Sequence, residues 1–288
     1  MNIFVYALIF WIISWALNEW LVRLNIRLKY FQQLRDILVP ILFGAALLGL
    51  WEGTTRGFGI SEILLPPPSM IWERIIESKQ ILWVDFQQTF MKAALIGFVL
   101  GCGSGFLVAI AIDRSPFLQK GLLPIGNFVS ALPIIGVAPI MVMWFGFDWP
   151  SKAAVVIIMT FFPMLVNTVS GLAASGSMER DLMQTYASSY WQTLFKLRLP
   201  MAAPFIFNAL KINSTLAMIG AIVAEFFGTP TVGMGFRIST GFGRMNVDLV
   251  WAEIAVAALA GSVFYGVIVL IERAVTFWHP SVRNRATV

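Results

Sequence analysis

Long apolar stretches, separated by shorter polar ones, run through this chain of 288 residues. A helix needs about 20 apolar residues to cross the hydrocarbon core of a bilayer. Seven stretches approach or exceed that length, although the second is short and the first contains Glu19. They are Ile3–Leu21, Ile37–Trp51, Phe86–Ile112, Leu122–Phe147, Ala153–Leu172, Phe205–Phe227 and Leu249–Ile271. The pattern predicts an all-α membrane protein folded as one polytopic helical bundle.

The composition agrees with a membrane protein and limits the chemistry of the chain. Hydrophobic residues make up 58% of it and charged residues only 12%, whereas soluble domains carry about 25% charged residues. Cys102 is the only cysteine and His279 the only histidine, so one subunit can form neither an intrachain disulfide nor a Cys–His nucleophile pair. We expect no catalytic residue, no metal site and no bound cofactor in this chain.

The basic residues predict an orientation in the membrane. The loops at 22–36, 113–121, 173–204 and 272–288 hold twelve Lys and Arg, and the loops on the opposite side hold six. Short cytoplasmic loops carry an excess of Lys and Arg. We therefore expect the N-terminus outside and the C-terminus in the cytoplasm.

Prolines interrupt the pattern at two places. The run Leu65–Ser69, with three consecutive prolines, stops any helix, and Ser69 is a candidate N-cap for a short external helix through Lys79. The fourth apolar stretch contains Pro133 and Pro139. Because proline removes a backbone donor and bends a helix, this segment is either a kinked structural helix or a lining of the solute pathway.

Small residues recur every four positions in the third stretch, at Ala93, Gly97, Gly101, Gly105 and Ala109. Such a stripe lets a second helix approach closely in lipid. The sequence favours a packing seam, with a moving gate surface as the alternative. The glycines lack the Lys-Ser/Thr that follows a phosphate-binding loop, so we exclude ATP binding by this chain.

A few polar residues lie inside or beside the apolar stretches. Asn167 and Asn213 favour hydrogen bonds between helices, with a place along the solute pathway as the alternative. Glu225 and Glu253 are acids near span ends. Acids within membrane segments are costly and mark functional sites, so each is either an interhelix partner or part of a gate.

One polar segment, Ser175–Pro200, is too regular to be a simple connector. Its apolar and polar residues alternate with a helical period. The pattern predicts a short helix, a turn and a second short helix that Pro200 ends. It also places Leu182, Tyr186 and Tyr190 on one face.

This segment resembles the cytoplasmic loop E-A-A-x3-G-x9-I-x-L-P of the permease subunits of bacterial ATP-driven importers. The matching positions are Asp181, Leu182 and Met183 for E-A-A, Ala187 for the glycine, Leu197 for the isoleucine, and Leu199 and Pro200 for L-P. The acid, the small residue, the aliphatic residue and L-P keep their character and spacing, whereas the glycine and both alanines are replaced.

The resemblance extends over nearly the whole chain. The segments that look like the nitrate, sulfonate and taurine branch of these permeases are Leu64–Ser69, Trp144–Gly146, Phe161–Pro163, Leu210–Ile212 and Ile222–Gly228. Two others, Trp191–Lys196 and Val232–Gly235, look closest to permeases for pyrimidine precursors of thiamine.

The resemblance implies a six-span importer core at 37–288 and an extra span with a basic loop at 1–36. It implies a homodimeric permease in the bacterial inner membrane, with two cytoplasmic ATPase subunits that bind ATP and Mg²⁺ and with an external solute-binding protein. The loop at 173–204 would be the coupling element, seated on the ATPase. The solute would be a small organic molecule or an anion.

Two other classes of protein remain open from the residues alone. A self-contained transporter driven by an ion gradient typically shows inverted repeats and paired broken helices, and only one apolar stretch here is clearly broken. A membrane-embedded enzyme is disfavoured because His and Cys are scarce.

Overall fold

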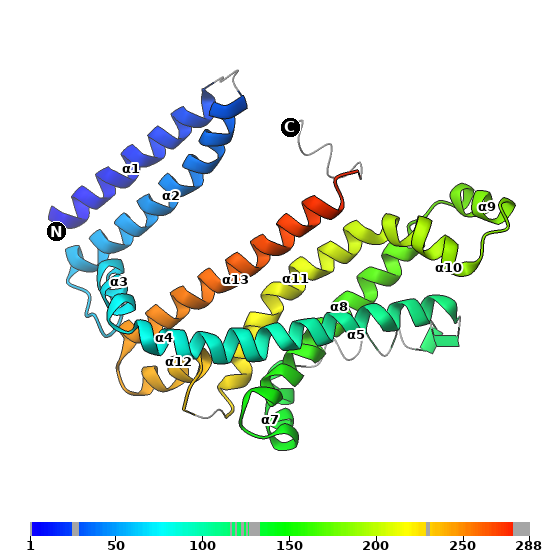
Figure 1. The fold of residues 1–288 in the computed structure, drawn as a ribbon. Helices are drawn as coiled ribbons and strands as arrows, with labels where there is room; N and C mark the ends of the chain where they lie inside the picture. Colours follow the sequence, from blue (N-terminus) through cyan, green and yellow to red (C-terminus); the bar gives the residue numbers. More distant parts are fainter. Residues whose placement is uncertain are drawn as a thin grey trace. The chain divides into compact units, whose positions relative to one another are not determined.

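The computed structural model describes residues 2–24, 29–115, 117–118, 120–121, 124, 126, 133–228 and 231–278. Within these ranges the chain is almost entirely helical and no strand occurs, so the predicted all-α fold is confirmed (Figure 1). The chain divides into two compact units. The first comprises Met1–Lys79 and Thr240–Glu253, and the second comprises Gln80–Ser239 and Ile254–Val288.

The first unit is built on a hairpin of α1 (Asn2–Arg23) and α2 (Lys29–Phe58). Gly49, Gly53 and Gly57 face α1 at intervals of four residues. A Cβ on Gly49 would lie 2.8 Å from the ring of Phe10, and one on Gly57 would lie 2.7 Å from the backbone nitrogen of Phe4. This close approach of two helices is the packing expected for small residues in lipid. The apolar pattern did not predict this packing, because the predicted second span ends at Trp51, before Gly53 and Gly57.

Helix α3 (Pro68–Glu77) follows in the same unit and corrects one expectation. Its N-cap is Pro67, with Pro68 in the first turn, and Ser69 makes no capping bond. Instead, the Ser69 backbone N–H and hydroxyl donate to the two carboxylate oxygens of Glu52, over 2.9 and 2.7 Å. Proline suits the first helical position because its missing N–H is not needed there, and a carboxylate near a helix N-terminus is favourable. Ser69 thus ties α3 to α2.

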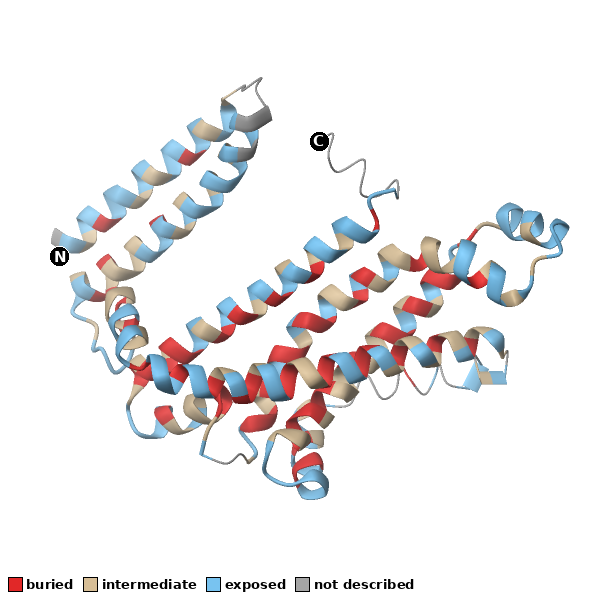
Figure 2. Ribbon diagram, in the orientation of Figure 1, coloured by how far each residue is buried: buried red, intermediate tan, exposed pale blue. Residues whose placement is uncertain are grey.

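The second unit contains most of the remaining helices. They are α4 (Lys79–Phe86), the π-helix η1 (Gln87–Ala94), α5 (Leu95–Arg114), α7 (Ile134–Phe145), α8 (Trp149–Ala173), α9 (Ser177–Thr185), α10 (Tyr190–Thr193), the π-helix η2 (Leu194–Arg198) and α11 (Leu199–Glu225). Helices α12 (Met234–Gly243) and α13 (Val247–Val275) belong in part to each unit. Helix α8 packs along α5 and along α11 (Figure 1). Buried residues accordingly line α5, α8 and α11 (Figure 2).

The stripe of small residues on α5 lies against α8. A Cβ on Gly97 would lie 2.6 Å from the Cβ of Val156, and one on Gly105 would lie 2.5 Å from the carbonyl oxygen of Phe161. At Gly101 it would overlap the Thr160 hydroxyl. Any larger side chain at these positions would push the two helices apart.

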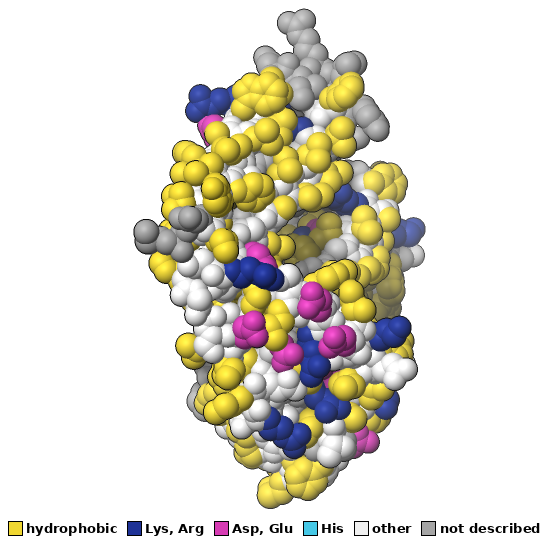
Figure 3. Space-filling view, turned by 90° about the vertical axis from the view of Figure 1, so that its left-hand side faces the viewer, with side chains coloured by type: hydrophobic (Ala, Val, Ile, Leu, Met, Phe, Trp, Pro, Cys, Tyr) yellow, Lys and Arg dark blue, Asp and Glu magenta, His cyan; other side chains and the backbone are white. Residues whose placement is uncertain are grey.

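Six helices among the described residues are long and apolar enough to cross a membrane. They are Ile3–Arg23, Leu34–Phe58, Lys79–Arg114, Trp149–Ala173, Tyr190–Glu225 and Val247–Val275. Of the predicted stretch Leu122–Phe147, α7 supplies a shorter apolar helix, and most residues before Pro133 lie outside the described part of the chain. Hydrophobic side chains cover large parts of the surface, as a lipid-facing protein requires (Figure 3).

Candidate functional site

The loop at 173–204 projects from the second unit as α9, a turn and α10 (Figure 1). The first short helix and the turn follow the expected pattern. The second does not stop at Pro200, because α10, η2 and α11 form one continuous helix from Tyr190 to Glu225. A proline ring clashes with the carbonyl four residues earlier in an α-helix. Here the wider π-helical turn of η2 comes directly before Leu199 and Pro200 and accommodates the ring.

The turn that ends α9 has the hydrogen bonds of a Schellman motif. The Ala187 N–H donates to the Gln184 carbonyl over 2.8 Å, and the Ser188 N–H donates to the Met183 carbonyl over 3.1 Å. Ala187 has φ 52°, in the left-handed region that favours glycine. Ala187 is the position that matches the glycine of the family loop, so the backbone geometry accounts for glycine at that place.

Replacing Ala187 by glycine is expected to stabilise the turn. A non-glycine residue in the left-handed region costs about 1 kcal/mol, and Ala187→Gly removes that cost without touching a buried contact, since Ala187 is exposed. Hydrogen exchange of the amides at 183–189 should slow. The matched control is Ala203→Gly within α11, which should destabilise its helix by about 1 kcal/mol. Faster exchange in Ala187→Gly would contradict the left-handed turn.

The start of α10 is capped as firmly as the end of α9. The Ser189 hydroxyl accepts from the Gln192 N–H over 3.3 Å, and the Ser189 N–H donates to the Gln192 side-chain oxygen over 2.8 Å. This reciprocal pair is a capping box. The Ser188 hydroxyl adds a 2.6 Å bond to the Met183 carbonyl. The two helices are therefore joined by a turn whose backbone is fixed on both sides.

An ion pair attaches the base of the loop to the membrane helices. The Arg198 guanidinium donates to both carboxylate oxygens of Asp113, at the end of α5, over 2.7 and 2.6 Å. It also donates to the Leu172 carbonyl, near the end of α8, over 3.0 and 3.1 Å. The Tyr190 hydroxyl donates to Asp113 over 2.9 Å. Arg198 and Asp113 are largely buried, with side chains 15% and 12% exposed, so the bidentate pair is poorly screened by solvent.

Apolar packing supports the same junction. Leu172, Leu194 and Ala202 are fully buried and are packed by partly buried neighbours, among them Tyr190 and Leu199. The ends of α5 and α8 and the start of α11 therefore hold the loop as a unit.

The outer surface of the loop carries large apolar side chains that the chain leaves exposed. Met178 is 81% exposed, Tyr186 is 76% exposed and Leu182 is 55% exposed. Tyr190 does not share their face, contrary to the expectation, because the turn separates it from α9 and its hydroxyl points to Asp113. Exposed apolar side chains grouped in this way are typical of an interaction surface.

The structure distributes the residues of the family loop between this surface and the base. Asp181, Leu182 and Ala187 are exposed on the projecting part, whereas Leu197, Leu199 and Pro200 are half-buried where it joins α11. Met183 is half-buried and supplies a carbonyl to the turn.

Asn213 makes hydrogen bonds between helices, whereas the Asn167 amide donates within its own helix. Asn213 is fully buried, and its amide donates to the Thr160 carbonyl over 2.7 Å and to the Cys102 sulfur over 3.1 Å. The Asn167 amide donates within α8 to the Pro163 carbonyl over 2.8 Å. Pro133 is the N-cap of α7 and Pro139 lies inside that helix; both are exposed.

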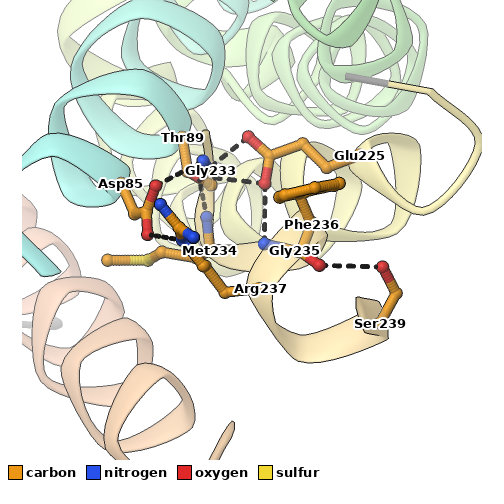
Figure 4. A network of polar contacts seen from close by, with 9 residues as sticks. All are labelled: Asp85, Thr89, Glu225, Gly233, Met234, Gly235, Phe236, Arg237 and Ser239. Atoms are coloured by element: carbon orange, nitrogen blue, oxygen red, sulfur yellow. Dashed lines mark hydrogen bonds and ion pairs between the residues drawn. The ribbon is translucent and has the colours of Figure 1, made fainter. Parts of the chain in front are cut away.

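Glu225 lies in a second buried cluster, at the N-terminus of α12 (Figure 4). Its carboxylate accepts from the Thr89 hydroxyl over 2.8 and 3.0 Å and from the Gly235 N–H over 2.7 Å. The Thr89 hydroxyl in turn accepts from the Met234 N–H over 2.8 Å. Glu253 is buried in α13, in the other unit.

Asp85 completes the cluster. It accepts from the Gly233 N–H over 2.6 Å and from the Arg237 guanidinium over 2.7 Å. The N–H groups of Gly233, Met234 and Gly235 have no partner inside a helix that begins at Met234. Side chains from α4, η1 and α11 accept from them instead. The cluster holds the end of α11 and the start of α12 against the continuous helix formed by α4, η1 and α5.

Asp148 holds the nearby start of α8. It is the N-cap, accepting from the Trp149 N–H over 2.7 Å, and the Gln88 amide donates to it over 2.8 Å. These two hydrogen bonds, first that of Trp149, lower the pKa of the Asp148 carboxyl. The sequence pattern did not predict Asp85, Thr89, Asp113 and Arg198. For the two acids, a position next to the end of an apolar stretch was the available signal.

Comparison with known proteins adds independent evidence. Residues 81–277 match the family described as binding-protein-dependent transport system inner membrane component. The chain is 30% identical over 241 residues to the formylaminopyrimidine transport permease protein of Halalkalibacterium halodurans, covering 84% of this chain and 96% of that protein. It is 31% identical over 242 residues to the riboflavin transport system permease protein of Chloroflexus aurantiacus (82% and 88%). It is 27% identical over 265 residues to the taurine transport system permease protein of Escherichia coli (89% and 96%).

Proposed function

Because this chain belongs to the family of inner membrane components of binding-protein-dependent transport systems, we propose that its loop at 173–204 couples solute movement to a partner ATPase. The chain is a multi-pass permease subunit of an ATP-driven importer and works with an ATPase and a binding protein. The resemblance inferred from its motifs is confirmed. The alternative of a self-contained ion-coupled transporter finds no support in these comparisons.

The proposal rests on one observation. The exposed apolar surface of Met178, Leu182 and Tyr186 is rigidly attached to the membrane helices. A partner that pulls on α9 must move the membrane helices rather than bend the loop. Capping on both sides of the turn and the Arg198–Asp113 pair meet this requirement. The pair joins the loop to the ends of α5 and α8, two helices that also pack along each other.

The proposed working cycle is the one that the resemblance to importer permeases implies, and this attachment suits it. ATP and Mg²⁺ bind to two ATPase subunits, which close and carry the loops of two permease copies together. The membrane helices then rock, the pathway opens to the docked binding protein, and hydrolysis resets it. Pro133, Pro139, Asn167, Asn213 and the buried acids Glu225 and Glu253 remain candidates for pathway or gate residues. This chain holds no catalytic site of its own in the proposal.

The orientation and the domain division stay part of the proposal. We place the N-terminus outside, the C-terminus and the 173–204 loop in the cytoplasm, and the complex in the bacterial inner membrane. The importer domain would be 37–288, and 1–36 an addition to it. The matched residues, 81–277, lie within the proposed importer domain.

A crosslinking experiment tests coupling and orientation together. In a Cys102→Ser background, Tyr186→Cys should form a crosslink to the ATPase subunit through a short maleimide photo-crosslinker, because Tyr186 is 76% exposed on the loop. Ser61→Cys is the matched control, since Ser61 is also exposed and lies between α2 and α3, on the side proposed to face outward. A crosslink from Ser61→Cys and none from Tyr186→Cys would overturn the proposal.

A further inference from the structure

A groove of about 590 Å³ in the second unit lies between α11, α13 and the middle of α12. Apolar side chains form most of its wall, including Met218, Ile222 and Ala257. Three hydroxyl groups also line it, those of Thr215, Ser262 and Tyr265. An apolar concavity of this size with a few polar groups is the usual form of a small-molecule site.

The hydroxyl groups of the groove retain hydrogen-bonding capacity. The Thr215 hydroxyl donates to the Ile212 carbonyl over 2.8 Å, which leaves its oxygen able to accept. Among the described residues, the Ser262 and Tyr265 hydroxyls make no hydrogen bond, and both side chains are exposed. A hydroxyl facing lipid without a partner costs about 1–3 kcal/mol. Two such hydroxyls, beside a third that can still accept, therefore favour a groove that faces water or a solute.

The groove offers no charge to a ligand. No Lys, Arg, Asp or Glu is among the described residues that line it. Lys211, one helical turn before Thr215, is held by Glu272 over 2.8 and 3.0 Å, and both side chains are largely buried. Glu225, three residues after Ile222, is bound by Thr89 and Gly235. A small anion would thus lose its hydration without gaining a cation.

We propose that this groove is a wall of the solute pathway and that it takes an uncharged, flat, largely apolar solute of the heterocyclic class. The inference rests on the proposed function and narrows its substrate. The Tyr265 ring offers a stacking face, and the Met218 thioether adapts to an aromatic edge. The hydroxyls supply the few polar contacts that orient a heterocycle. A sulfonate or another small anion does not fit this wall.

The test is protection of single cysteines from alkylation, in permease purified by means of a tag on its ATPase partner. In the Cys102→Ser background, Ser262→Cys and, as a second reporter, Thr215→Cys are treated with N-ethylmaleimide. The probes are riboflavin, formylaminopyrimidine and taurine. We expect either heterocycle to slow alkylation of both reporters at least about threefold and taurine to leave it unchanged. Ser61→Cys, exposed between α2 and α3, should react at the same rate with every probe.

The outcomes separate this inference from the proposed function. Recovery of the permease with its ATPase supports the proposed function whatever the probes do. Equal protection by taurine, or reporters that react but are protected by neither heterocycle, would overturn the substrate class. A Ser262→Cys disulfide between two permease copies, or reporters that do not react because lipid covers them, would show that the groove is not a solute wall.

Discussion

Arg198→Ala is expected to abolish ATP-driven uptake while the complex still binds and hydrolyses ATP. Removing one partner of a buried ion pair costs about 3–5 kcal/mol, because the other charge stays buried and unpaired. Here that charge is Asp113, which would keep only the Tyr190 hydroxyl. The Leu172 carbonyl would keep only the Ser175 hydroxyl, at 3.4 Å. A loss of only about 2.7 kcal/mol in the stability of the attachment would lower the population of molecules with an attached loop about a hundredfold. Uptake and ATPase activity measured on the same proteoliposomes check this.

Two variants show whether the geometry or only the charge of Arg198 matters. Arg198→Lys keeps the charge but cannot bond both Asp113 oxygens and the Leu172 carbonyl in the same way, so it should retain part of the uptake. Arg23→Ala is the matched control, since Arg23 pairs with Glu19 over 2.7 Å at an exposed site. Exposed pairs contribute about 0–1 kcal/mol, so uptake should persist. Normal uptake by Arg198→Ala would contradict a rigid attachment through this pair.

The apolar pattern predicted most of this fold because bilayer thickness imposes a length that a sequence displays directly. The boundaries were less predictable. The third span begins at Lys79 rather than Phe86, and the sixth begins at Tyr190 rather than Phe205. The sixth span is extended through polar residues by the π-helical segment η2, and the third is extended by α4, which the π-helical segment η1 joins to α5. A hydropathy pattern contains no signal for such a turn.

The functional loop was recognisable because its features are local. Cap residues, a helical period and a left-handed position all fall within Ser175–Pro200. The attachment of the loop was not predictable, because Arg198 and Asp113 lie 85 residues apart. Likewise, the small-residue stripe on α5 indicated a close neighbour but could not identify α8 as that neighbour.

Glycine at position 233 is expected to be indispensable. Its φ of 128° is one that side chains rarely adopt, and a Cβ there would lie 2.7–2.8 Å from the carboxyl atoms of Glu225. Gly233→Ala should therefore push that carboxylate off Thr89 and the Gly235 N–H. Backbone strain of about 1–3 kcal/mol adds to the loss of charged hydrogen bonds worth about 1.5–3 kcal/mol each. The thermal midpoint of the purified complex should fall by several degrees, and uptake should be lost with it.

Gly266→Ala is the matched control for this prediction. Gly266 lies within α13 in the same unit, and a Cβ there would meet no atom within 4 Å. Since alanine favours a helix by about 1 kcal/mol over glycine, this variant should be as stable as the parent or slightly more so. If both variants melt like the parent, Glu225 does not hold the start of α12. If Gly233→Ala lowers the midpoint but uptake per folded complex is unchanged, the cluster only stabilises the fold, and Glu225 is not part of a gate.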